Sequence, residues 1–345
     1  MQPSDRAGPS PLTSRGSGRL SRLKYPLVND VNMQQATAPT GRQFEIAGGG
    51  YRAVATEVGA GLRVLEHAAD GEVRPLIAAY GEHEAVRHGA GQILAPWANR
   101  VAGGRYTFDG EARQLDVTEP ATGNAIHGLT RWLPWRLAAH TADSVRLELS
   151  LFPHPGYPHT LELAVEYRVG TDGLAVDICA RNTGVHPAPY GFGAHPYITP
   201  GVHPAEGRAD EWTLHLPAER YLAVDERMIP RGGFDVDSSP YDFRKPRTLA
   251  GTALDTAFGG LQRELDGIGR IRLSAPGGNA VTLWLDRGLE WVQVFTGDAL
   301  AGGSRRAAVA IEPMTAPPDA FNSGTDLKRL EPGDTVTHRW GIQVS

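Results

Sequence analysis

Residues 144–181 read SVRLELSLFPHPGYPHTLELAVEYRVGTDGLAVDICAR, and this stretch decides the fold. Apolar side chains occupy alternate positions over 145–151, 161–169 and 174–180, with charged or small residues between them. Such alternation over six or more residues predicts β-strands that have one buried face and one wet face. The two breaks, 153–158 and 170–173, are short and contain Gly or Pro, as turns between antiparallel neighbours require.

The same kind of pattern recurs toward the C-terminus. Amphipathic helices longer than about two turns are absent from the sequence pattern, and so are internal repeats. Many short strands joined by Gly- and Pro-containing turns predict an all-β chain, built as a large antiparallel sandwich or barrel. The further strands that we expect are Arg270–Ala275, Ala280–Asp286, Trp291–Thr296, Ala307–Ile311 and Thr335–Val344.

The first forty residues differ from the rest. Residues 1–40 are rich in Ser, Pro, Gly and Arg and show almost no apolar periodicity. A segment of this composition buries too little apolar surface to offset its ordering entropy, so we expect a disordered N-terminal extension. Met33 stands just before the first strand-like sequence and is an alternative to Met1 as the true start. We expect residues 41–345 to form one domain.

Composition excludes several classes of protein. The chain has 345 residues, of which 41% are hydrophobic, so it can bury a large core. Its one cysteine, Cys179, excludes a disulfide framework and a cysteine zinc cage. A net charge of −5, with only three lysines among the 34 basic residues, argues against nucleic-acid binding. Apolar runs of the roughly 20 residues that a membrane span needs are absent. We therefore expect a soluble, cytoplasmic protein without a nucleic-acid or membrane partner.

Ionisable side chains gather in five segments beside Gly or Pro, where loops leave a rigid sheet and functional residues concentrate. These segments are PWANR at 96–100, NAIHG at 124–128, YGFGAHPY at 190–197, DTAF at 255–258 and IEPMT at 311–315. Each candidate also has a plainer interpretation: a structural His195, a turn-capping His127, a helix N-cap at Asp255, a surface Arg100, and a solvated strand end at Glu312. The other histidines, including His83 and His88, lack metal-ligand spacing, so we expect no metal site.

Taken together and in this order, the segments resemble the aldose 1-epimerase (mutarotase) family from about Ala95 to Gly324. The resemblance rests on Asn-Arg, Asn-x-x-His-Gly, Gly-Phe-Gly-x-His-Pro-Tyr, Asp-Thr-Ala-Phe, Gln-Val-Phe-Thr-Gly and Glu-Pro-Met-Thr. It implies a galactose-mutarotase-like fold, a large antiparallel β-sandwich, in agreement with the alternation. It also implies interconversion of the α and β anomers of a free aldose without a cofactor.

The resemblance also implies a role for each residue. His195 corresponds to the general acid that protonates the ring oxygen, and Glu312 to the general base at the anomeric hydroxyl. Arg100, His127 and Asp255 correspond to ligands of the sugar hydroxyls. Where many family members have His-Thr-Tyr-Phe, this chain has His-Pro-Tyr-Ile at 195–198, which leaves the preferred sugar open.

Mutarotation needs a base and an acid on opposite sides of one C–O bond, since the C1 hydroxyl loses a proton while the ring oxygen gains one. Burial of Glu312 would raise its pKa from about 4.3 and make it a better base. His195 starts near about 6.5, so it could act as an acid at neutral pH with little tuning. We expect the two groups to face each other across a pocket as wide as one monosaccharide.

Three alternatives stay open. Arg131 follows the His127 turn and could meet an anionic substituent, so a phosphorylated or otherwise anionic hexose is an alternative substrate. A glycoside hydrolase would use Asp255 and Glu312 as a carboxylate pair and leave His195 without a role. A non-catalytic sugar-binding protein would keep Arg100 and Asp255 but need neither acid nor base. The expected partner is a monosaccharide, and the chain is expected to be a monomer or homodimer.

Overall fold

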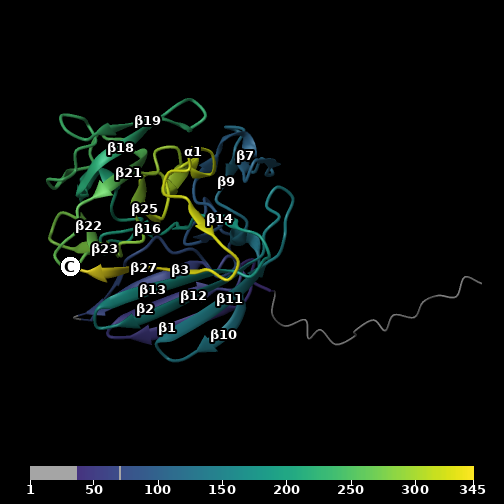
Figure 1. Ribbon diagram of the computed structural model, residues 1–345. Helices are drawn as coiled ribbons and strands as arrows, with labels where there is room; N and C mark the ends of the chain where they lie inside the picture. The colour runs from purple at the N-terminus through teal and green to yellow at the C-terminus, as the bar shows by residue number, and fades with distance from the viewer. Residues whose placement is uncertain (1–36, 70) are drawn as a thin grey trace, which may run out of the picture. The chain divides into compact units, whose positions relative to one another are not determined.

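Every strand pair that the structure describes is antiparallel. The structure is a computed structural model that describes residues 37–69 and 71–345, and residues 37–345 fall in one compact unit. The expected disordered extension lies, apart from residues 37–40, outside the described residues, as does the Met33 start. Within the described ranges, none of the helices has the length and apolarity to cross a membrane. The predicted all-β, antiparallel class is confirmed (Figure 1).

Three sheets hold most of the strands. The nine-stranded sheet has the order β10 (Arg136–His140), β11 (Ser144–Leu151), β12 (Leu161–Gly170), β13 (Gly173–Asn182), β27 (Thr335–Val344), β23 (Ala280–Leu285), β22 (Gly269–Ser274), β17 (Thr213–His215) and β20 (Arg247–Thr248). The four-stranded sheet is β1 (Gln43–Gly48), β2 (Tyr51–Thr56), β3 (Leu62–Ala69) and β4 (Glu72–Pro75).

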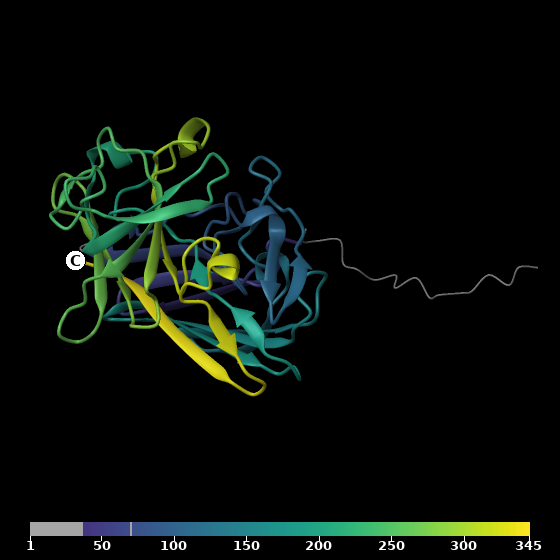
Figure 2. The ribbon, with the colours of Figure 1, turned by 45° about the horizontal axis from the view of Figure 1, so that its top comes forward.

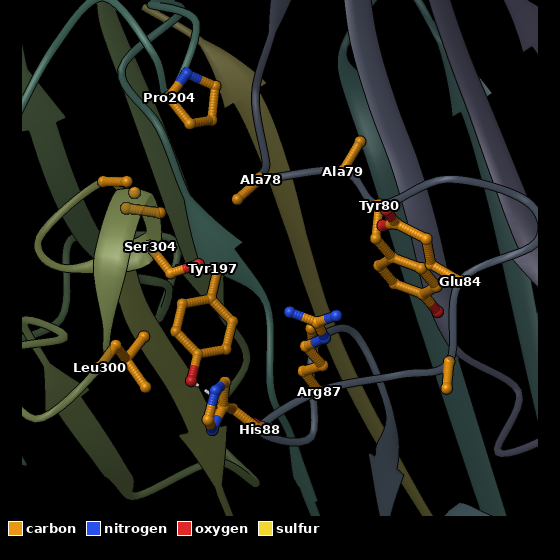
Figure 3. A pocket seen from close by; sticks show the side chains of 15 residues that line it. Ala78, Ala79, Tyr80, Glu84, Arg87, His88, Tyr197, Pro204, Leu300 and Ser304 are labelled. Atoms are coloured by element: carbon orange, nitrogen blue, oxygen red, sulfur yellow. Dashed lines mark hydrogen bonds between the residues drawn. The ribbon is translucent and has the colours of Figure 1, made fainter.

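The eight-stranded sheet has the order β19 (Pro230–Asp235), β18 (Ala218–Val224), β21 (Asp255–Leu261), β24 (Trp291–Phe295), β25 (Val309–Met314), β15 (Gly193–Ala194) and β5 (Ile93–Leu94), and β16 (Tyr197–Ile198) also pairs with β25. Three two-stranded pieces accompany the sheets: β6 (Arg100–Val101) with β9 (Ala125–Ile126), β7 (Arg105–Phe108) with β8 (Glu111–Gln114), and β14 (Ala188–Tyr190) with β26 (Lys328–Leu330). The described helices are α1 (Ala320–Ser323), which lies beside the blue β7–β8 hairpin in Figure 2, and 3-10 turns at Ala102–Gly104, Thr130–Trp132, Ala209–Glu211 and Gly302–Ser304.

The apolar residues that alternate in the sequence form the buried face of the nine-stranded sheet. Leu147 on β11 lies opposite Val165 on β12, which lies opposite Ile178 on β13, and all three are buried. The four-stranded sheet contacts this sheet where β1 and β2 meet β11 and β12, and buried side chains of both sheets belong to one core cluster. Burial of two facing apolar layers is what gives a sandwich most of its stability.

The predicted strands are found near their expected bounds, with one difference that matters for the site. Residues 307–311 were expected to form a strand, with Glu312 exposed to solvent at its end. Instead β25 begins at Val309 and continues to Met314, and all six of its residues are buried. The interpretation of Glu312 as a solvated strand end is wrong, because β25 is buried throughout and its neighbours β24 and β15 extend the ladder past that point.

Candidate functional site

A row of polar side chains crosses three adjacent strands of the eight-stranded sheet. Glu312 on β25 lies directly opposite Gln293 on β24, so their side chains share one face. Gln293 Nε2 donates a 2.6 Å hydrogen bond to Oδ1 of Asp255, the first residue of β21. The N-cap interpretation of Asp255 is therefore wrong, since this residue begins a strand. The sheet thus places two carboxylates and an amide in one line.

His195 completes this row on the far side of Glu312. Its Nε2 lies 3.3 Å from Glu312 Oε1, and the two residues are 5% and 2% exposed. His195 stands between β15 and β16, which both pair with β25, so the two short strands hold the imidazole against the carboxylate. The imidazole and the carboxylate were expected on two sides of a sugar-wide pocket. Instead they are in direct contact, because their strands are hydrogen-bonded neighbours.

Three more groups enclose the imidazole of His195. The ring of Tyr197 stacks on it with centroids 5.0 Å apart, and the ring of His127 meets it edge-on at 5.3 Å. Gly89 packs against its other atoms: a Cβ built on Gly89 would lie 3.1 Å from His195 Cδ2, and this glycine has a φ of +73°. Any side chain at position 89 would therefore crowd the imidazole.

Burial moves both members of the pair toward their neutral forms. Burial raises the pKa of Glu312 well above its ordinary value, the negative charge of Asp255 adds to the rise, and Arg100 opposes it. Burial lowers the pKa of His195 to about 3, helped by the positive charges of Arg131 and His88 and opposed by a backbone hydrogen bond. The expectation that His195 needs little tuning is therefore wrong. Burial therefore favours the neutral form of each group, and neither titrates like its free side chain.

The remaining predicted ligands surround this pair. Arg100 follows Asn99 at the start of β6 and affects the pKa values of both Asp255 and Glu312, so its charge lies close to them. Its guanidinium is largely buried and is paired with a glutamate, so it is not an ordinary surface arginine. Burial lowers the pKa of His127, as do His195 and two arginines, which leaves a neutral imidazole suited to hydroxyl groups.

The turn that carries His127 depends on two left-handed residues. His127 has a φ of +63° and Gly128 one of +67°, and the N–H of His127 donates to the carbonyl of Asn99. A Cβ on Gly128 would lie 2.1 Å from the carbonyl oxygen of Ala95, so only glycine fits there. The Asn-x-x-His-Gly motif is thus the sequence of a turn that fixes an imidazole beside His195.

An open cavity lies beside Tyr197, and Arg87 and His88 also line it (Figure 3). Its volume is about 240 Å³, and neither His195 nor Glu312 lines it; the link to the pair is Tyr197, whose ring stacks on His195. The Tyr197 hydroxyl donates to the carbonyl of His88, and the Arg87 side chain points into the space. The cavity is therefore a neighbour of the acid–base pair.

Sequence reasoning did not assign a role to two residues of this site. Gln293 lies within the Gln-Val-Phe-Thr-Gly motif, and the available sequence signal was an amide between otherwise apolar residues of an expected strand. Glu119 binds Arg100 through two hydrogen bonds, and the pattern around it gave no signal. Within residues 37–69 and 71–345, there is no group of three or more His, Cys, Asp or Glu side chains arranged to hold a metal ion.

Comparison with known proteins identifies the family of this chain. The model of the family described as aldose 1-epimerase matches residues 42–343. A protein of Escherichia coli K12 named YihR, itself uncharacterised, is 35% identical over 91% of this chain and 96% of its own length. The aldose 1-epimerase of the same organism is 30% identical over 52% of this chain and 53% of its own length.

Solved structures agree on the fold. A GalM/aldose epimerase homologue from C. elegans superimposes with a TM-score of 0.78 at 20% identity, covering 88% of this chain and 98% of its own. A galactose mutarotase-like protein from Clostridium acetobutylicum gives a TM-score of 0.76 at 16% identity, covering 87% and 94%. The predicted galactose-mutarotase-like sandwich is therefore confirmed. By the family match across nearly all of residues 37–345, the chain belongs to the aldose 1-epimerase family.

Proposed function

We propose that this protein is an aldose 1-epimerase that interconverts the α and β anomers of a free hexose by opening and reclosing the ring. The observation that carries the proposal is the buried contact of 3.3 Å between His195 Nε2 and Glu312 Oε1. Family membership supports the reaction class, and the names of relatives such as galactose mutarotase support a hexose.

The proton count of the pair matches the reaction. Burial favours the neutral form of each group, so Glu312 first passes its proton to His195 across their 3.3 Å contact. Ring opening then starts with Glu312 ionised and His195 protonated: the carboxylate takes the proton of the C1 hydroxyl while the imidazolium gives one to the ring oxygen. Opening therefore leaves Glu312 protonated and His195 neutral, with one proton on the pair before and after. Rotation about C1–C2 presents the other face of the aldehyde, and the reverse transfer closes the ring. Ring closure returns Glu312 to the carboxylate and His195 to the imidazolium, so the pair is ready for the next turnover.

The surrounding groups orient the sugar. Neutral His127 and the carboxylate of Asp255 offer acceptors or donors to hydroxyl groups, and Arg100 offers a rigid set of N–H donors. Gln293 holds Asp255 by a 2.6 Å hydrogen bond and stands beside Glu312, so it fixes the spacing of the two carboxylates. A glycoside hydrolase would have no use for the imidazole in contact with Glu312, and a binding module would need neither group.

The experiment is polarimetry on freshly dissolved α-D-glucose and α-D-galactose in weak buffer, with and without protein. We expect an accelerated approach to the equilibrium rotation for at least one sugar, and no release of p-nitrophenol from p-nitrophenyl glycosides. If the protein accelerates the mutarotation of none of the aldoses tested, D-glucose 6-phosphate included, the proposal is overturned.

Arg131 favours a second candidate, a hexose with an anionic substituent. Its charge affects the pKa values of His127 and His195, and among the described residues it makes no ion pair within 4 Å. Burial lowers its pKa, and the negative charge of Glu119 opposes the shift without forming an ion pair with it. D-glucose 6-phosphate belongs in the same assay: turnover that exceeds that of glucose and is lost selectively in Arg131→Gln would support this candidate.

The pH profile is expected to lack the break that a free histidine would produce. Because burial lowers the pKa of His195 to about 3, the pair takes up a second proton only far below 6.5. We therefore expect kcat to stay within about twofold between pH 5 and 7.5, and to fall at higher pH once the pair loses its shared proton. Exchange NMR at constant ionic strength measures this, and a tenfold loss of kcat centred near pH 6.5 would contradict it.

A further inference from the structure

Arg100 is held by a carboxylate that the family resemblance did not assign. Nε of Arg100 donates to Glu119 Oε2 at 2.7 Å and Nη2 donates to Oε1 at 2.8 Å, with side chains 11% and 21% exposed. Two parallel hydrogen bonds fix the plane of a guanidinium as well as its position. An arginine has five N–H donors, so this pairing leaves three for a ligand. Because Glu119 fixes the guanidinium plane, it also fixes the directions in which these three donors point.

Glu119 is itself fixed within a closed turn. Its backbone N–H donates to the carbonyl of Asn124 at 3.0 Å, and its carbonyl accepts from Gly123 N–H at 2.9 Å. The hydroxyl of Thr122 donates to the same carboxylate that holds Arg100. The conformation of residues 119–124 therefore decides where the Glu119 carboxylate points.

A residue about a hundred positions away locks this turn. Arg227, in the loop between β18 and β19, donates to the carbonyls of Thr122 and Gly123 at 2.9 and 2.8 Å and to Asn124 Oδ1 at 3.1 Å. Asn124 is fully buried and donates back to the carbonyl of Arg227 at 2.7 Å. Asp225 in turn shapes the loop, since its carboxylate accepts from the N–H groups of Arg227 and Ile229.

We propose that Glu119 and Arg227 are positioning residues that set the affinity for the sugar through Arg100. The chain of contacts runs from the β18–β19 loop through the turn 119–124 to the guanidinium, and none of its steps involves Glu312 or His195. Loss of either residue should weaken sugar binding and leave the proton transfers intact. This inference rests on the proposed function only in taking Arg100 as a sugar ligand.

The test is a double-mutant cycle with Glu119→Gln and Arg227→Ala, in which KM and kcat are measured on the best aldose of the polarimetric panel. We expect each single variant to raise KM about tenfold, as loss of hydrogen bonds to a charged group does, with kcat within about threefold of wild type. The double variant should raise KM about as much as Glu119→Gln alone, because Arg227 acts through the turn. Arg227→Lys should recover part of the affinity.

Arg231→Ala is the matched control, since Arg231 is exposed on β19 and pairs with Glu226 without touching the turn. Unchanged KM in Glu119→Gln, or fully multiplicative KM changes in the double variant, would overturn the inference. Titration calorimetry with D-glucose, D-galactose and D-glucose 6-phosphate separates it from the proposed function. Weakened binding in both variants of a protein without mutarotase activity would uphold the positioning role and overturn only the function.

Discussion

Glu312→Gln is expected to lower kcat by roughly 10²–10⁴-fold, the range that one positioned proton transfer contributes. An amide of the same shape fills the same buried space but cannot take the proton of the C1 hydroxyl. Arg100, His127 and Asp255 are unaffected, so KM should stay within about threefold. Exchange NMR on the equilibrium mixture of anomers measures both constants.

Folding controls are straightforward for this variant. Burial raises the pKa of Glu312, so ionised Glu312 is less stable in the fold than in water, and the uncharged amide should leave the thermal midpoint unchanged or higher. Glu162→Gln, at an exposed position of β12, is the control for the chemical change itself. Full activity in Glu312→Gln would remove this residue from its role as base.

His195→Asn is expected to cause a loss of kcat of the same size, again roughly 10²–10⁴-fold. Asparagine can donate a hydrogen bond toward the ring oxygen but cannot deliver a proton. Because ring opening needs both transfers in one step, the acid is of little use once the base is lost. The double variant with Glu312→Gln should therefore be about as slow as either single variant, as in catalytic groups that act as a unit.

A second buried histidine supplies the control for removing an imidazole. His159 is 7% exposed and packs against Tyr157 and Phe108, away from the acid–base pair. His159→Asn should retain kcat even if it lowers the thermal midpoint. Losses that multiply in the Glu312→Gln/His195→Asn double variant, as for two independent groups, would contradict the transfer of both protons in one step.

The fold could be predicted from the sequence wherever a strand has one wet face. Strands β11, β12 and β13 show it, since their outer positions alternate with buried ones. Strand β25 lacks this alternation because every one of its residues is buried, so the strand was expected to end before Glu312. Pro313 adds to the difficulty, because proline is uncommon inside a sheet.

The site could be predicted as a set of residues, yet its geometry could not. The resemblance supplied the five candidates and the structure gathers them around one contact, while their roles stay predictions. The depressed pKa of His195 depends on Gly89 and Tyr197, which enclose the ring through contacts that the local sequence does not specify. Glu119 was missed for a similar reason: its partner Arg100 lies 19 residues earlier, and the fold alone brings them together.

The most direct measurement of the central claim is a crystal structure of the Glu312→Gln variant soaked with the aldose that the wild type turns over fastest. The account predicts the C1 hydroxyl within about 3.2 Å of the side chain at position 312 and the ring oxygen within the same distance of His195 Nε2. A sugar whose anomeric centre lies beyond the reach of both groups, for example in the cavity past Tyr197, would contradict it.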